Sequence, residues 1–186
     1  MIGTHNSFTY QKATFKPFDW FSFLWKCQTK TIEEQVAMNV SYFDIRVKWD
    51  KKNDCWRTCH GIVSFDKTYN TLKEILDDFD LLFVRIILEK RNDIAVSKFK
   101  EQIDQIKDGY EDLLFACIKD GWEILLDRDS TLIDYTYKPW ISGLSFWENI
   151  KRFNFFSTIK KWAKKNNPEI TEDIISSDVV HFMDLV

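Results

Sequence analysis

This sequence has no long apolar run, few glycines and prolines, and no large excess of one charge. Of its 186 residues only five are glycine and three are proline, and no low-complexity linker or clear internal repeat divides the chain. No apolar run reaches the roughly 18 residues that a membrane-spanning helix needs. The net charge is −3 with both signs mixed, which argues against a nucleic-acid-binding surface.

Cysteine and histidine are also few, with four and three copies. Cys55 and Cys59 are separated by three residues and have no matching second pair, so their spacing does not favour a zinc site. We interpret the cysteines as reduced structural thiols, and a disulfide stays open if the protein is exported. The four are Cys27, Cys55, Cys59 and Cys117.

No secretory signal is visible, because Met1 lies only four residues before His5. The compartment is left open between a soluble protein, one peripheral at a membrane, and a secreted protein whose leader has been removed.

What the sequence does contain is enough apolar material for one core. It is 45% hydrophobic and 16% aromatic, and its length fits a single domain over residues 1–186. The near-continuous apolar run LLFVRIILE (81–89) is typical of a strand buried on both faces of a parallel sheet. Further strands are expected at 41–47, 56–60, 122–127 and 179–186.

Helices are expected between these strands. Thr31-Ile-Glu-Glu34 has the pattern of a capping box, and Thr71-Leu-Lys-Glu74 repeats it before an apolar face. Helices are also expected at 95–118 and 147–165, whereas 129–146 receives no assignment. Alternating strands and helices predict an α/β fold with a parallel sheet.

Polar residues collect at the expected strand ends. Asp44 and Arg46 stand two apart in FDIRV and therefore share one face of a strand. The others follow or close a strand, at the edge where the active sites of parallel barrels lie. They are His5, His60, Glu89, Arg128 and Asp184.

These motifs resemble the X domain of phosphatidylinositol-specific phospholipases C. The resemblance is carried by GTHNS with His5, YFDIRV with Asp44 and Arg46, and CHG with His60, in that order. It is good over about 1–91 and patchy over 92–165. It returns at SDVVHFMDLV, which is similar to the closing strand of the family.

The resemblance implies a compact, distorted TIM-like (β/α) barrel that cleaves the phosphodiester of a phosphoinositide or a glycosyl-phosphoinositide. A barrel of this kind usually needs about 250 residues, so elements around 129–146 would be shortened or missing. His5 would be the general base on the inositol 2-hydroxyl. His60 would be the general acid, and a cyclic inositol phosphate would form. Asp184 would hold the tautomer of His5, because closure of the barrel places the last strand beside the first.

The residue at position 46 indicates whether the resembled chemistry would use a metal ion. Metal-dependent members of the family have an acidic residue there, whereas metal-independent bacterial members have arginine, whose guanidinium can bind the phosphoryl oxygens. Arg46 therefore favours chemistry without a metal or other cofactor. Asn6 and Glu89 are nevertheless similar to the calcium-using branch, so calcium stays open. Asn6, Glu89 and Arg128 are the expected substrate-binding residues.

Two other functions remain open. One is a phosphodiesterase acting on glycerophosphodiesters or sphingomyelin through a magnesium site of clustered carboxylates, which Arg46 opposes. The other is a degenerate barrel that binds phospholipid headgroups without turnover. His181 lies three positions before Asp184 and is therefore expected on the opposite face of the strand, toward the helices, so it is interpreted as structural.

The aromatic stretch FKPFDWFSFLW (15–25) follows the first strand. It either enters a lipid interface beside the site or packs under the mouth of the barrel. Lys12, Lys16 and Lys26 around it would suit anionic lipid. We expect a monomer that meets its phospholipid substrate at a peripheral membrane surface.

Overall fold

A computed structural model describes most of the first 110 residues and shorter parts of the rest. The described residues are 2–22, 25–79, 83–89, 92–110, 114–118, 123–124, 132–134, 159–169, 171–172 and 180–184. The predicted substrate-binding residue Arg128 and nearly all of the unassigned segment 129–146 lie outside them. None of the described helices is both long and apolar enough to cross a membrane.

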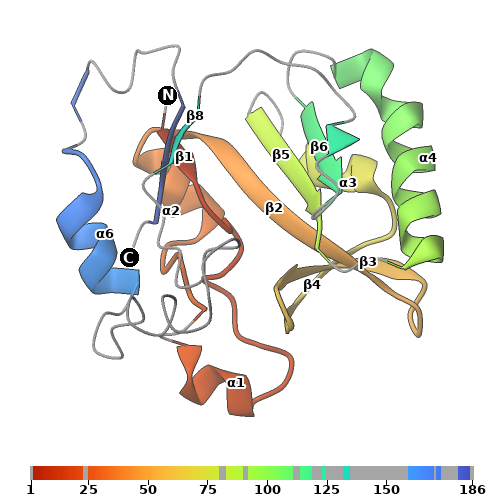
Figure 1. Ribbon diagram of the computed structural model, residues 1–186, viewed down its shortest axis with the longest axis horizontal. Coiled ribbons are helices and arrows are strands. Elements are labelled where there is room, and N and C mark those ends of the chain that lie inside the picture. Colours follow the sequence, from red (N-terminus) through yellow and green to blue (C-terminus); the bar gives the residue numbers. More distant parts are fainter. Residues whose placement is uncertain are drawn as a thin grey trace, which may run out of the picture.

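One mixed sheet organises the described residues (Figure 1). Its strands follow the order β7-β6-β5-β2-β1-β9-β8, and the hairpin of β3 and β4 is attached to β2. Parallel pairing joins β6 to β5, β5 to β2, β2 to β1, β1 to β9 and β9 to β8. These strands are β1 (Ile2–Thr4), β2 (Val40–Asp50), β5 (Phe83–Leu88), β6 (Leu114–Ile118), β8 (Leu132–Asp134) and β9 (Val180–Met183).

The expected closed barrel is wrong for the described part of the chain, where the sheet is open and ends at β7 and β8. β7 (Glu123–Ile124) pairs antiparallel with β6. A strand that turns straight back ends the series of parallel crossovers from which a barrel is built. The fold is therefore mixed α/β with an open sheet.

The segment 56–60 is a strand, but it is not the parallel strand that was expected. β3 (Cys55–His60) pairs antiparallel with β2, and β4 (Val63–Tyr69) pairs antiparallel with β3. Only four residues separate β2 from β3, and Asp54 among them has a φ of 52°. That connection is far shorter than the ten or more residues a parallel crossover requires, so the chain forms a hairpin.

The helices partly follow the sequence pattern. α2 (Ile32–Ala37) begins with the complete capping box, in which Thr31 and Glu34 each accept the other's backbone N–H. α3 (Leu72–Asp78) has only half of one: Thr71 accepts from the N–H of Glu74, but the Glu74 carboxylate accepts from Asn70 instead.

The expected helix 95–118 ends early. α4 (Asp93–Tyr110) is followed by strand β6, whose sequence LFACI is apolar throughout. α6 (Ile159–Asn166) matches the end of the expected helix 147–165 and extends one residue past it, and the preceding part of that prediction falls outside the described residues. The short α1 (Pro17–Trp20) lies within the aromatic stretch.

The core lies between the sheet and α3 and α4. Ala95, Phe99 and Ile103 repeat every four residues on α4, and all three are fully buried. Trp56 of β3 packs edge-on against Phe99, with ring centroids 5.9 Å apart. Its indole N–H donates to the side chain of Gln102 at 2.8 Å. These contacts attach the hairpin firmly to the helical layer, so β3 is held in a defined position.

The two ends of the described chain meet within the sheet. β1 lies between β2 and β9, and Ile2, Gly3 and Thr4 pair with residues 181–183. The last strand therefore lies beside the first, as expected, although direct pairing within an open sheet brings this about.

Candidate active site

His5 is the first residue after β1, and backbone contacts hold it in place. Its N–H donates to the carbonyl of Met183 at 3.0 Å, and its own carbonyl accepts from the Gln28 side chain at 2.8 Å. The side chain is 13% exposed, so one edge of the imidazole can meet a ligand while the backbone stays anchored to two strands.

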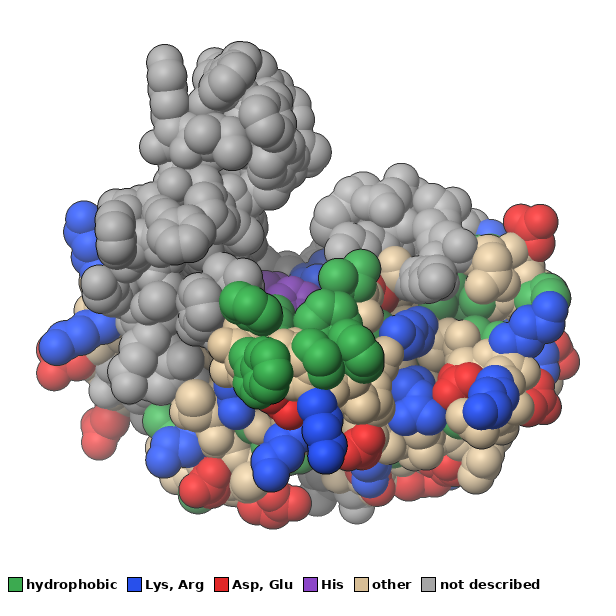
Figure 2. Space-filling model, turned by 90° about the horizontal axis from the view of Figure 1, so that it is seen from below, with side chains coloured by type: hydrophobic (Ala, Val, Ile, Leu, Met, Phe, Trp, Pro, Cys, Tyr) green, Lys and Arg blue, Asp and Glu red, His purple; other side chains and the backbone are tan. Residues whose placement is uncertain are grey.

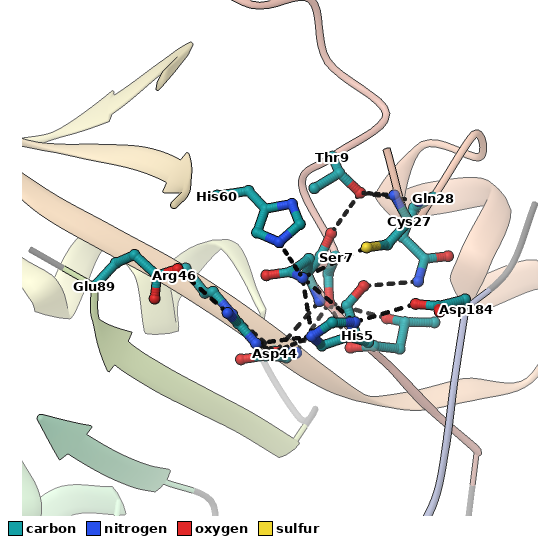
Figure 3. Close-up of polar contacts among 12 residues, drawn as sticks. His5, Ser7, Thr9, Cys27, Gln28, Asp44, Arg46, His60, Glu89 and Asp184 are labelled. Carbon is teal, nitrogen blue, oxygen red and sulfur yellow. Dashed lines mark hydrogen bonds and ion pairs between the residues drawn. The ribbon is translucent and has the colours of Figure 1, made fainter. Parts of the chain in front are cut away.

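Asp184 contacts His5 from the end of β9 (Figure 3). The distance between Nδ1 of His5 and Oδ1 of Asp184 is 3.1 Å, and Asp184 is buried. On the other side of the ring, Nη2 of Arg46 lies 2.8 Å from Nε2. A guanidinium can only donate, so Nε2 accepts, and Nδ1 carries the proton that it donates to Asp184. The nitrogen of His5 that faces Arg46 is thus the unprotonated one.

Asp44 and Arg46 share one face of β2, as their spacing predicted. The Asp44 carboxylate accepts from Nε and Nη2 of Arg46 at 3.3 and 3.2 Å, and from the N–H of Asn6 at 3.3 Å. Burial, the largest single influence, would raise the pKa of Asp44, but Arg46, Arg85, His5 and the N–H of Asn6 together outweigh it and hold that pKa below its ordinary value. Asp44 is therefore a buried anion that positions Arg46.

Glu89 completes the surroundings of the guanidinium. Oε1 of Glu89 accepts from Nη1 of Arg46 at 3.3 Å and from the N–H of Gly61 at 2.9 Å. Burial would lower the pKa of Arg46, yet Asp44 and Glu89 together raise it. Arg46 is consequently a permanent cation between two carboxylates.

His60 reaches the same place through the hairpin. β2 runs past the site to Asp50, and β3 returns antiparallel, with Thr58 opposite Val47. Two residues later His60 is back near the level of Asp44 and Arg46. Its ring centroid lies 6.2 Å from that of His5, at an interplanar angle of 78°. His60 does end a strand, as expected, but an antiparallel return brings it to the site.

The protonation of His60 follows from its partners. Nδ1 lies 2.7 Å from the carbonyl oxygen of Trp25, which can only accept, so Nδ1 carries a proton. Burial, then the positive charge of Arg46 and the neighbouring His5, lower the pKa of His60 to about 4. In the free protein near neutral pH, Nε2 of His60 is therefore unprotonated.

Asn6 lies between the two imidazoles. Its side-chain amide nitrogen is 2.9 Å from Nε2 of His5 and 3.2 Å from Nε2 of His60. Its φ of 50° is in the left-handed region, which asparagine tolerates better than most residues. Its Oδ1 is buried without a hydrogen-bond partner among the described residues.

The sequence did not point to Cys27 and Gln28, which also belong to this site. The thiol of Cys27 accepts from the Asn6 amide at 3.5 Å. The buried Gln28 donates to the carbonyls of His5 and Met183, at 2.8 and 3.3 Å. Neither residue stands at a strand end or in a spaced motif. The sequence therefore carries no signal that would single them out.

The aromatic stretch divides in two. Trp25 is buried against Phe65, with centroids 5.4 Å apart, whereas Trp20 is 80% exposed and Phe15 and Phe21 are also exposed. Ile62, in the turn after His60, is 79% exposed. Figure 2 shows an apolar cluster on the surface next to the visible histidine. We call Phe15, Trp20, Phe21 and Ile62 the rim patch.

Comparisons with known proteins support the fold. No protein-family model matches the sequence, and no curated protein matches it significantly. The structure is similar to the phosphatidylinositol-specific phospholipase C from Listeria monocytogenes, with a TM-score of 0.64 and 14% sequence identity. The match covers 100% of this chain and 87% of that one. It establishes a fold distantly like that of this phospholipase C.

Proposed function

We propose that this chain is a phosphodiesterase of the phosphatidylinositol phospholipase C type. Its substrate would be a phosphoinositide or glycosyl-phosphoinositide, cleaved at the glycerophosphate ester. The observation that carries the proposal is the arrangement around His5: a basic Nε2, a permanent guanidinium 2.8 Å from it, and a second imidazole 6.2 Å away between ring centroids. A base, a phosphate-binding cation and a candidate acid thus share one opening.

His5 would begin the reaction as general base. Nε2 takes the proton of the inositol 2-hydroxyl while that oxygen attacks phosphorus. The buried Asp184 carboxylate stabilises the imidazolium through Nδ1. The bond from phosphorus to the glycerol oxygen breaks, and the product is a cyclic inositol phosphate with free diacylglycerol.

Arg46 would stabilise the charge that builds on the phosphoryl oxygens. Bound substrate would draw Nη2 away from His5 and leave Nε2 free for the hydroxyl. Support for a reaction without calcium comes from the same residue, because its guanidinium occupies the space between the Asp44 and Glu89 carboxylates. A calcium ion there would need those oxygens and would be repelled by the guanidinium, so the residues present do not fit calcium.

His60 would protonate the departing glycerol oxygen from Nε2. With a pKa of about 4 it lacks that proton in the free protein, so it must acquire one as substrate binds. An anionic phosphodiester beside the ring would favour the imidazolium and offset the repulsion from Arg46. Asn6 would then rotate its amide, so that Oδ1 accepts from the protonated ring.

Asn6 and Glu89 would also contact the inositol hydroxyls, because both present side-chain oxygens beside Arg46 and His5. Arg128 remains a predicted substrate-binding residue. The rim patch would contact the membrane that contains the substrate, since exposed aromatic side chains partition well into a lipid interface.

A headgroup-binding protein without turnover is the second candidate. The neutral state of His60 favours it, because such a site binds an anionic phosphate through Arg46 but has no proton to donate. The magnesium-dependent alternative has less support, since Arg46 neutralises the carboxylates it would use.

Turnover of a water-soluble inositol phosphodiester, followed by phosphorus NMR, separates these candidates. We expect a cyclic inositol phosphate from the wild type, and loss of turnover in His5→Ala and in His60→Ala. A wild type that binds phosphoinositide vesicles but forms no product would instead establish the binding protein. Thermal melting shows whether each variant is folded.

A further inference from the structure

A cysteine lies beside the imidazole and carboxylate of the candidate base. A ring nitrogen of His5, Sγ of Cys27 and a carboxylate oxygen of Asp184 all lie within 4.8 Å of one another, and Nδ1 is the nitrogen that faces Asp184, at 3.1 Å. Cys27 is only 2% exposed, and burial followed by the nearby Asp184 carboxylate raises the pKa of its thiol well above the ordinary value. The proposed reaction gives this sulfur no role.

The segment that carries Cys27 is fixed against the strands of the site. The Thr9 hydroxyl accepts from the backbone N–H of both Cys27 and Gln28, at 3.0 and 2.9 Å. The Gln28 side chain donates to carbonyls of the His5 and Met183 backbone. Two hydrogen bonds therefore attach this segment to Thr9 (Figure 3), and two attach it to the strand ends that carry His5 and Asp184.

The charges of this trio match a divalent ion. A thiolate, a carboxylate and a neutral imidazole sum to −2, so a divalent cation would leave the buried cluster neutral. Thiolate and imidazole together favour Zn²⁺ and similar transition metals over calcium and magnesium. Bond lengths of about 2.0–2.3 Å to nitrogen, oxygen and sulfur require the three ligand atoms to close inward only slightly.

Asn6 supplies a second observation. Its amide lies 3.5 Å from the Cys27 sulfur, and its buried Oδ1 has no hydrogen-bond partner among the described residues. An orphaned oxygen at this depth is costly. It provides an acceptor for a metal-bound water, which would fill the fourth position of a tetrahedral site.

We propose that His5, Cys27 and Asp184 bind a thiophilic divalent transition metal such as Zn²⁺, and that this metal switches off the candidate base. Coordination at Nδ1 moves the ring proton to Nε2, the atom that must accept the inositol proton. It also removes the Asp184 carboxylate from Nδ1. The thiol releases its proton as the bond from sulfur to metal forms. The inhibition rests on the proposed function, whereas the binding does not.

Absorption with Co²⁺ as the probe tests the binding. We expect a near-ultraviolet sulfur-to-cobalt charge-transfer band at one equivalent in the wild type. The band should disappear in Cys27→Ser and persist in Cys59→Ser, a matched control at another buried cysteine. A band that persists in Cys27→Ser, or a wild type without one, would overturn the site.

A further variant tests the same sulfur ligand if Cys27→Ser fails to fold. The triple variant Cys55→Ser, Cys59→Ser, Cys117→Ser retains Cys27 alone, and its band should match that of the wild type. If the band is lost there while melting shows a folded chain, the sulfur ligand is not Cys27 and the proposal is wrong.

Inhibition is measured separately on the soluble inositol substrate. Zn²⁺ should suppress wild-type turnover, and the concentration for half-inhibition should rise by more than about tenfold in Cys27→Ser, relative to its own metal-free rate. Equal inhibition of both proteins would refute the switch. If the wild type has no turnover at all, the proposed function fails while the cobalt band still decides the metal site.

Discussion

Nδ1 of His5 lies 3.1 Å from the Asp184 carboxylate, although 179 positions separate the two residues. Strand pairing between β1 and β9 creates this contact, and Arg46 on the opposite side of the ring determines which nitrogen carries the proton.

Asp184→Asn should lower turnover of the soluble substrate by about 10²- to 10⁴-fold. An amide can donate to Nδ1, which favours the tautomer with a proton on Nε2, and it cannot stabilise the imidazolium. Asp50→Asn is the control, because Asp50 is likewise an aspartate paired with a basic side chain, that of Arg57 at 2.9 Å. Equal rates for wild type and Asp184→Asn would exclude His5 as the base.

Arg46→Lys should reduce turnover by about 10²-fold or more, because a lysine cannot span Asp44, Glu89 and a phosphate with one planar group. Arg57→Lys provides the matched comparison on the neighbouring strand, and its rate should stay near that of the wild type. Steady-state kinetics of both variants on the soluble substrate measure the difference. Similar losses in the two would mean that Arg46 acts only through stability.

Calcium at millimolar concentration, or its removal by a selective chelator, should leave turnover unchanged. The reason is the guanidinium between Asp44 and Glu89, which takes the place of the ion. A strict calcium requirement would contradict the proposed role of Arg46. Chelators that also bind zinc should restore any activity lost to that metal.

Acid should destabilise the protein through His60. Its folded pKa of about 4 is below the ordinary 6.5, so between those values the unfolded chain binds more protons. Stability is therefore complete above about pH 6.5 and falls toward pH 4, by at most about 3 kcal/mol from this group. Urea unfolding of the wild type and His60→Gln at several pH values should show a smaller loss in the variant. Parallel curves would refute the buried neutral histidine.

Trp20→Ala and Ile62→Ser should weaken binding to phosphatidylinositol vesicles by about tenfold each, because each side chain would bury a large apolar surface in the interface. The ratio of vesicle to soluble-substrate turnover should fall with binding. Val36→Ser is the control: Val36 is 41% exposed on α2, which precedes β2, and is not part of the rim patch. Sedimentation with vesicles measures binding. Unchanged binding of Trp20→Ala would show that the rim patch does not contact the membrane.

The sequence predicted individual elements better than their connections. The apolar run near residue 85, the capping box at Thr31 and the alternation of Asp44 with Arg46 depend on neighbours in the chain, and the structure contains each of them. The predicted parallel direction of β3 was wrong, because five residues with strand propensity look the same whether the strand belongs to a hairpin or follows a parallel crossover. The end of α4 was missed because the apolar residues of β6 also fit a helical face.

Local chemistry along the chain was enough to determine which residues carry charge and which alternate on one face of a strand. Tertiary structure alone decided that β9 pairs with β1, that β3 returns antiparallel to bring His60 beside His5, and that Cys27 lies against both His5 and Asp184. The physical reason is that pairing register and the packing of distant segments depend on the burial of the whole core, which no short stretch of sequence encodes.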